Sequence, residues 1–222
     1  METFELETPS VLIDLDVMQR NVSRMQAHCD SLGLKLRAHV SAHKIPDIAR
    51  MQIDSGAQGI ACQKVSEAQL FTEAGFNDVL IPYNIVGTQK TNKLADLALF
   101  NRVTVSVDHV RVLDMLAEAA KADEMSLRVL VELATDAGRT GAQVDEVVTL
   151  AERIEEDENL HFGGRAGLCS RRGSASSATG CDQSTERGGH WRRCGQRRRH
   201  AAGGPCFQYS RTDGTACREL CV

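Results

Sequence analysis

Three short stretches of this sequence gather side chains that can do chemistry. Residues 37–44, RAHVSAHK, hold two histidines and two cations, residues 62–67 read CQKVSE, and residues 136–141 read DAGRTG. In the third stretch, glycines on both sides of Arg139 give the backbone the freedom to present the guanidinium. A guanidinium presented in this way suits an anionic or heteroaromatic group, so the sequence indicates a small-molecule site.

The elements that must position these stretches are predicted strands and helices in alternation. We expect strands at residues 11–15, 34–40, 59–62, 79–81, 103–107 and 127–133, with another beginning at 161. Helices are expected after Asp16, after Pro46, and at residues 65–74, 88–100, 110–122 and 144–154, with Asp16 and Asp108 as N-caps.

This alternation predicts an α/β fold with a parallel sheet. A doubly wound sheet and a (β/α) barrel both fit the number of repeats. The three reactive stretches follow strands, and α/β folds place their sites at the carboxyl ends of strands.

The composition divides the chain in two. Residues 1–163 hold 15 Lys and Arg against 26 Asp and Glu, a balance of −11, whereas residues 164–222 hold 11 Arg and 4 acids, a balance of +7. The second part contains six of the eight cysteines and three aliphatic residues of the Ile, Leu, Val or Met type. We therefore expect a globular domain at 1–163 and a tail at 164–222 that cannot bury enough apolar surface to order itself.

Each reactive stretch also has a simple structural interpretation. His39 and His43 can be structural polar groups at a strand end, Lys44 can lie on a solvated helix face, and Arg139 can belong to an ordinary turn. The sequence has no phosphate-binding P-loop, GxGxxG, HExxH or nucleophile elbow. No single stretch therefore identifies a function.

In their order, however, the motifs resemble a known family. The matching segments are TPSVLIDLD at 8–16, LRAHV at 36–40 with His43 and Lys44, GIACQKVSEA at 59–68, GFNDVLIPYN at 75–84 and GRTG at 138–141. Over residues 8–163 the sequence resembles the pyridoxal-phosphate enzymes of the alanine-racemase-like barrel class (fold type III). Within that class it is most similar to the group of D-threonine aldolase, D-serine dehydratase and 3-hydroxy-D-aspartate aldolase.

The resemblance implies a (β/α) barrel that holds pyridoxal phosphate at its mouth, followed by a β-domain. A lysine after the first barrel strand would form an imine with this cofactor, and the protonated imine withdraws electrons so that a bond at the substrate Cα can break. Arg139 matches the arginine that faces the cofactor ring. The resemblance also places at the mouth His39, His43, Gln63 and Tyr83.

The sequence departs from the family pattern Arg-Pro-His-x-Lys-Thr-His-Lys. Ser41 stands at the position of the imine-forming lysine, and Ala38 and Ala42 replace the proline and threonine. A serine hydroxyl cannot form an imine. Lys44 matches the second lysine and would replace the first only if the strand end shifted. We therefore expect weak or no cofactor binding and no catalysis by this chain.

The tail at 164–222 lacks the family's expected continuation, including the phosphate loop and the ligands for a divalent metal. Its excess of Arg, Gly, Ala, Ser and Cys is typical of GC-rich DNA read out of frame, so we interpret it as a frameshifted, non-native segment. Its arginines could bind nucleic acid, but the acidic body and the missing recognition module argue against this. Its cysteines form no CxxC pair, which argues against zinc.

The predicted function is therefore a pyridoxal-phosphate lyase on a D-amino acid, such as retro-aldol cleavage of a D-3-hydroxy amino acid, inactive in this form. The alternatives are a truncated barrel fragment with no activity, or a dehydratase or racemase in an intact parent. No membrane span or secretory signal is visible, so we expect a cytoplasmic protein. An intact parent would be a homodimer of the family type. The sequence does not choose among aldolase, dehydratase and racemase.

Overall fold

A parallel sheet and the helices between its strands form the body of the protein. The computed structural model describes residues 5–134, 139–166, 191–193, 207–209 and 219–221. The strands of the body are β1 (Lys35–His39), β2 (Gly59–Ala61), β3 (Asp78–Ile81), β4 (Arg102–Val107), β5 (Leu127–Glu132) and β6 (Leu160–Ala166). The helices are α1 (Leu15–Ser31), the 3₁₀ turn η2 (Val40–Ala42), α2 (Pro46–Asp54), α3 (Val65–Glu73), α4 (Thr88–Phe100), α5 (Val110–Ala122) and α6 (Val144–Glu156).

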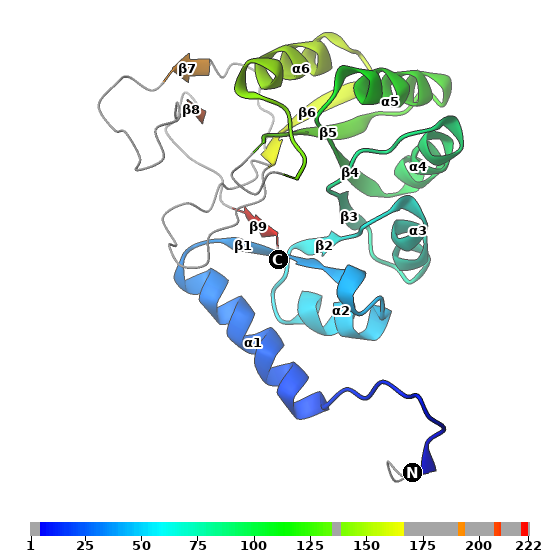
Figure 1. The fold of residues 1–222 in the computed structure, drawn as a ribbon, viewed down its shortest axis with the longest axis vertical. Coiled ribbons are helices and arrows are strands. Elements are labelled where there is room, and N and C mark those ends of the chain that lie inside the picture. The colour runs from blue at the N-terminus through cyan, green and yellow to red at the C-terminus, as the bar shows by residue number, and fades with distance from the viewer. Residues whose placement is uncertain (1–4, 135–138, 167–190, 194–206, 210–218, 222) are drawn as a thin grey trace.

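The strand order decides between the two architectures that the sequence allowed. Strands β1 to β6 lie side by side in sequence order, and each pair is parallel. Right-handed connections between successive neighbours place every crossover helix on the same face. Figure 1 shows α2 to α6 together on the outer side of the curved sheet. A doubly wound sheet would carry helices on both faces, so the predicted incomplete barrel is confirmed.

The main core lies between the sheet and this outer layer of helices. β4 and β5 are buried along almost their whole length, as expected for parallel strands covered on both sides. Their outward residues pack with buried positions of the helices, among them Phe71, Leu94 and Leu116. A smaller cluster of Ala61, Leu80 and Leu130 is buried separately from this core. The sheet is therefore packed against the helices, and the loops of the candidate site follow the carboxyl ends of its strands.

The predicted strand at residues 11–15 is wrong. The segment is not a strand, and its apolar side chains are exposed, with Val11 at 96% and Leu12 at 60%. Asp16 is also not the helix cap, because Asp14 takes that role and accepts a hydrogen bond from Val17 N at 2.9 Å. An apolar alternation forms a strand only where a neighbouring strand pairs with it.

Three short strands lie in the tail. β7 (Trp191–Arg193) pairs antiparallel with β8 (Phe207–Tyr209), and β9 (Glu219–Cys221) pairs parallel with β1 and extends the sheet beyond it. The rest of the predicted non-native segment, residues 167–190, 194–206, 210–218 and 222, lies outside the described residues. Among the helices that the structure describes, none is both long and apolar enough to cross a membrane.

Candidate functional site

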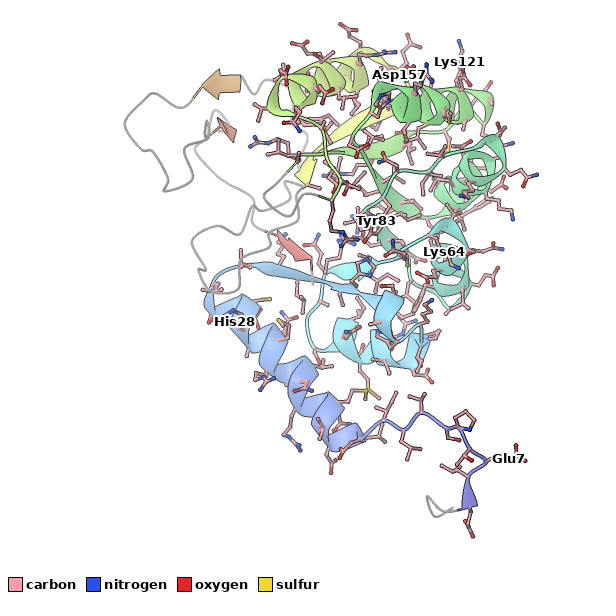
Figure 2. The ribbon with its side chains drawn as sticks, viewed as in Figure 1. Glu7, His28, Lys64, Tyr83, Lys121 and Asp157 are labelled. Carbon is pink, nitrogen blue, oxygen red and sulfur yellow. The ribbon has the colours of Figure 1, made fainter. Side chains whose placement is uncertain are left out.

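The predicted site residues lie at the carboxyl ends of the strands. His39 ends β1, Gln63 follows β2, Tyr83 follows β3 and Arg139 follows β5. All these strands are parallel, so their carboxyl ends share one edge of the sheet. Figure 2 shows Tyr83 near the middle of the molecule, whereas Lys64 lies in the outer layer beside α3.

Ser41 and His39 form a hydrogen-bonded pair where β1 runs into the 3₁₀ turn η2. The Ser41 hydroxyl lies 2.9 Å from Nδ1 of His39, and the Ser41 backbone N–H donates to the same nitrogen at 3.4 Å. Because Nδ1 accepts from the backbone, it carries no proton, and the hydroxyl donates to it. Burial lowers the pKa of His39, and the nearby Glu67 carboxylate partly opposes this shift. At neutral pH the ring is therefore an uncharged proton acceptor.

Glu67 links two of the predicted stretches. It is a buried residue in the first turn of α3, and its Oε2 accepts from the backbone N–H of Gln63 at 2.9 Å. Its Oε1 forms an ion pair with Nζ of Lys44 at 3.1 Å. Lys44 has a left-handed backbone with a φ of 57°, and its side chain is 58% exposed. The ion pair between the Lys44 amine and Glu67 thus connects the turn after β1 to α3.

Tyr83 joins the Ser41–His39 pair, whereas His43 contacts a helix. The rings of Tyr83 and His39 meet edge to face, with their centroids 6.4 Å apart. Nδ1 of His43 accepts from the backbone N–H of Ile45 at 3.0 Å. Burial lowers the pKa of His43, while the neighbouring Gln52 of α2 and the Ile45 backbone oppose the shift. The structure therefore brings together His39, Ser41 and Tyr83 and leaves His43 in a packing role.

Arg139 lies in a loop anchored at the ends of β4 and β5. The Arg139 side chain is exposed. The next residue, Thr140, donates its hydroxyl proton to Oε1 of Glu132 at 2.6 Å, and Gly141 N donates to Oδ2 of Asp108 at 3.0 Å. In the sheet, β5 is separated from β1 by three strands. Arg139 therefore approaches the site from the opposite side to the His39 group.

Glu132 is a buried acidic residue that contacts this loop. The residue is 5% exposed, and burial raises the pKa of its carboxyl group. The Thr140 hydrogen bond and the Arg139 charge lower this pKa, while the Asp108 charge raises it. The carboxyl group thus lies between a cation and a second carboxylate at the strand ends.

Sequence reasoning missed three acidic residues of this edge. Asp108 was predicted to cap α5, but His109 is the N-cap and accepts from Arg111 N at 3.1 Å. Glu67 and Glu132 were inside recognised segments but were not selected. A charged residue directly after an apolar run, as Glu132 after VLV at 129–131, is the signal that identifies it.

The cysteine of the second stretch is buried. Burial, with a smaller contribution from the Glu67 charge, raises the pKa of the Cys62 thiol to about 12. Within the described part of the chain, no three His, Cys, Asp or Glu side chains gather to hold a metal ion. The described edge therefore offers an imidazole, hydroxyls, a guanidinium and carboxylates as its reactive groups.

Comparison with known proteins gives matches that cover most of the chain. Residues 13–196 match the family described as alanine racemase, N-terminal domain. The chain is 38% identical over 160 residues to a D-threonine aldolase of Arthrobacter sp., which covers 72% of this chain and 42% of the relative. It is 35% identical over 167 residues to a 3-hydroxy-D-aspartate aldolase of Paracoccus denitrificans, covering 74% and 43%.

A solved structure agrees with the sequence matches. The crystal structure of D-threonine aldolase from Filomicrobium marinum superposes with a TM-score of 0.71 at 38% identity, covering 73% of this chain and 44% of that one. The chain thus spans less than half the length of these relatives. It belongs to the alanine racemase N-terminal domain family.

Proposed function

We propose that this family member is the barrel portion of a pyridoxal-phosphate lyase for D-amino acids, and that the chain as it stands is not a catalyst. The substrate class is a D-3-hydroxy amino acid, and the parent reaction is retro-aldol cleavage. The named relatives support the substrate class, since two are aldolases of D-amino acids. The arrangement of His39, Tyr83 and Arg139 along one strand edge supports a ligand site there.

The residues present do not fit covalent attachment of the cofactor. Ser41 stands where the resemblance requires the imine-forming lysine, and its hydroxyl is held by His39 at 2.9 Å. The one lysine close in sequence, Lys44, is engaged by Glu67 at 3.1 Å. Pyridoxal phosphate, when bound, would supply an electron-withdrawing imine at the substrate Cα. This chain offers no free amine at its anchoring position, so we derive no reaction step through the cofactor.

The remaining groups suit recognition of a ring and an anionic or hydroxylated ligand. His39 is uncharged at neutral pH because its pKa is lowered, and since its Nδ1 accepts from Ser41, its Nε2 carries the proton and can donate a hydrogen bond to a ligand. The exposed Arg139 guanidinium supplies positive charge. The observation that supports the proposal is the Ser41–His39 pair, because a serine hydroxyl held by His39 stands where the resemblance implies the imine-forming lysine.

The test is reductive trapping of the cofactor on lysine. The purified chain and its Ser41→Lys variant are incubated with pyridoxal phosphate, reduced with borohydride and mapped by peptide mass spectrometry. We expect no preferential pyridoxyl labelling in the original chain, with Lys44 labelled no more than the exposed Lys90 and Lys93 of α4. In the variant we expect residue 41 to be labelled well above these surface lysines.

A Ser41→Met variant is the matched control, because it adds a long side chain without an amine. Preferential labelling of Lys44 in the original chain would contradict the proposal that it is inactive. A folded Ser41→Lys chain whose residue 41 is labelled no more than Lys90 would contradict the placement of Ser41. Glycine release from D-threonine, compared with L-threonine, then tests the substrate class.

A further inference from the structure

Asp108 binds two separate loops of the strand edge through its two carboxylate oxygens. Oδ1 accepts from Nδ2 of Asn84 at 2.7 Å, and Oδ2 accepts from the backbone N–H of Gly141 at 3.0 Å. Asn84 returns the contact, because its Oδ1 accepts from the Asp108 backbone N–H at 3.2 Å. Hydrogen bonds to an ionised carboxylate are stronger than neutral ones. Asp108 is therefore the common anchor of the loops after β3 and β5.

Both anchored residues adjoin residues of the candidate site. Asn84 follows Tyr83, whose ring meets His39, and Gly141 is two positions after Arg139. The hydrogen bonds of Asp108 thus connect the two halves of the site, which lie on either side of β4. A carboxylate half-buried between the loops fixes the distance between them.

We propose that Asp108 is the positioning residue that sets Arg139 relative to the His39–Tyr83 group. The inference rests on the role proposed for Arg139 above. The inference also requires that the Asp108 carboxylate is not the N-cap of α5. The structure meets this requirement, because His109 caps the helix. Loss of the Asp108 carboxylate should therefore release the 139–141 loop without fraying α5.

Other hydrogen bonds hold the loop to β5, and the bond from Gly141 to Asp108 holds it to the end of β4. Glu132 holds Thr140 by its side chain, and the backbone pairs Ala142 N with Glu132 O at 2.8 Å and Ala134 N with Ala142 O at 2.9 Å. These bonds fix the loop to β5 alone. The Asp108–Gly141 bond is the described contact that ties it across to β4 and, through Asn84, to β3.

Limited trypsin digestion measures the loop directly, because Arg139 is exposed and precedes Thr140. We expect Asp108→Ala to raise the rate of cleavage after Arg139 about tenfold, relative to cleavage after Arg20 in α1. The double variant Asn84→Asp with Asp108→Asn keeps the charge and every donor–acceptor pair of the network. It should return cleavage to the original rate, which a general loss of stability would not predict.

The second readout is cofactor labelling in the Ser41→Lys background. Asp108→Ala should raise the pyridoxal-phosphate concentration needed for half-maximal labelling of residue 41 by about tenfold, and the double variant should restore it. Unchanged cleavage after Arg139 in Asp108→Ala would overturn the proposal, as would a double variant that behaves like Asp108→Ala in the digestion. If residue 41 is not labelled in any variant, the proposed function fails, while the digestion still decides the role of Asp108 in placing the loop.

Discussion

The hydroxyl group of Ser41 donates a hydrogen bond of 2.9 Å to Nδ1 of His39. Ser41, which stands where the resemblance implies the imine-forming lysine, is thus hydrogen-bonded into the end of β1. The same imidazole contacts the ring of Tyr83, and the Glu67 charge raises the pKa of the imidazole. The protonation state of His39 therefore affects both the candidate site and the stability of the fold.

The lowered pKa of His39 predicts a pH-dependent stability. A histidine in the unfolded chain has a pKa of about 6.5. At pH values between this pKa and the lower pKa of the folded chain, the unfolded chain therefore binds more protons than the folded chain. Stability therefore falls as the pH drops through this window. We expect His39→Gln to lose less stability than the original chain between pH 7.5 and 5.5 in urea unfolding. His28→Gln, on the exposed side of α1, is the control and should follow the original chain.

The buried Arg37 forms an ion pair with Asp78. Arg37 Nη1 lies 2.9 Å from Oδ1 of Asp78, and the Arg37 side chain is 2% exposed. Asp78→Asn removes the carboxylate that lies 2.9 Å from this buried charge, and we expect a loss of about 3–5 kcal/mol in the free energy of unfolding. Arg102→Ala removes a surface partner of the same carboxylate and should cost no more than about 1 kcal/mol. Equal losses in urea titrations of the two variants would refute this assignment.

Gly141 is required by the backbone of the Arg139 loop. Its φ is 116°, and a Cβ would collide with backbone atoms of Leu133 and Ala134, including Ala134 Cα at 2.6 Å. We expect Gly141→Ala to cost at least about 2 kcal/mol. Gly33, with a φ of 63° and open space around it, is the matched site, and Gly33→Ala should cost roughly 1 kcal/mol. Thermal or urea unfolding that ranks Gly33→Ala as the more damaging change would contradict this view of the loop.

The Cys62 thiol should be inert in the folded protein. Its pKa is raised to about 12, mainly by burial, so almost no thiolate exists at pH 8. We expect iodoacetamide to leave Cys62 unmodified at pH 8 and to modify it in urea, as shown by peptide mapping. A Ser55→Cys variant, at an exposed position after α2, supplies the reactive control. Modification of Cys62 at the rate of residue 55 would show that the barrel opens readily.

The helices and strands of the body could be predicted because each pattern is local. Residues 88–100 and 110–122 were expected as helices and are α4 and α5, and the predicted strands at 79–81 and 127–133 differ from β3 and β5 by one residue. Apolar spacing reflects which side of an element is buried, so it is present in the sequence itself. The segment at 11–15 failed because a strand also needs a neighbour, which no local pattern contains.

The sequence by itself determined the family and the alternation of elements, because these depend on residue identity and order. Only the tertiary structure decided for the barrel over the doubly wound sheet, since the choice depends on the order in which strands pair. It also gave Asp108 its bridging place between Asn84 and Gly141, which lie 24 and 33 residues away in the chain. Contacts at such separations are fixed when parallel strands bring their carboxyl ends together, and they leave no local pattern in the sequence.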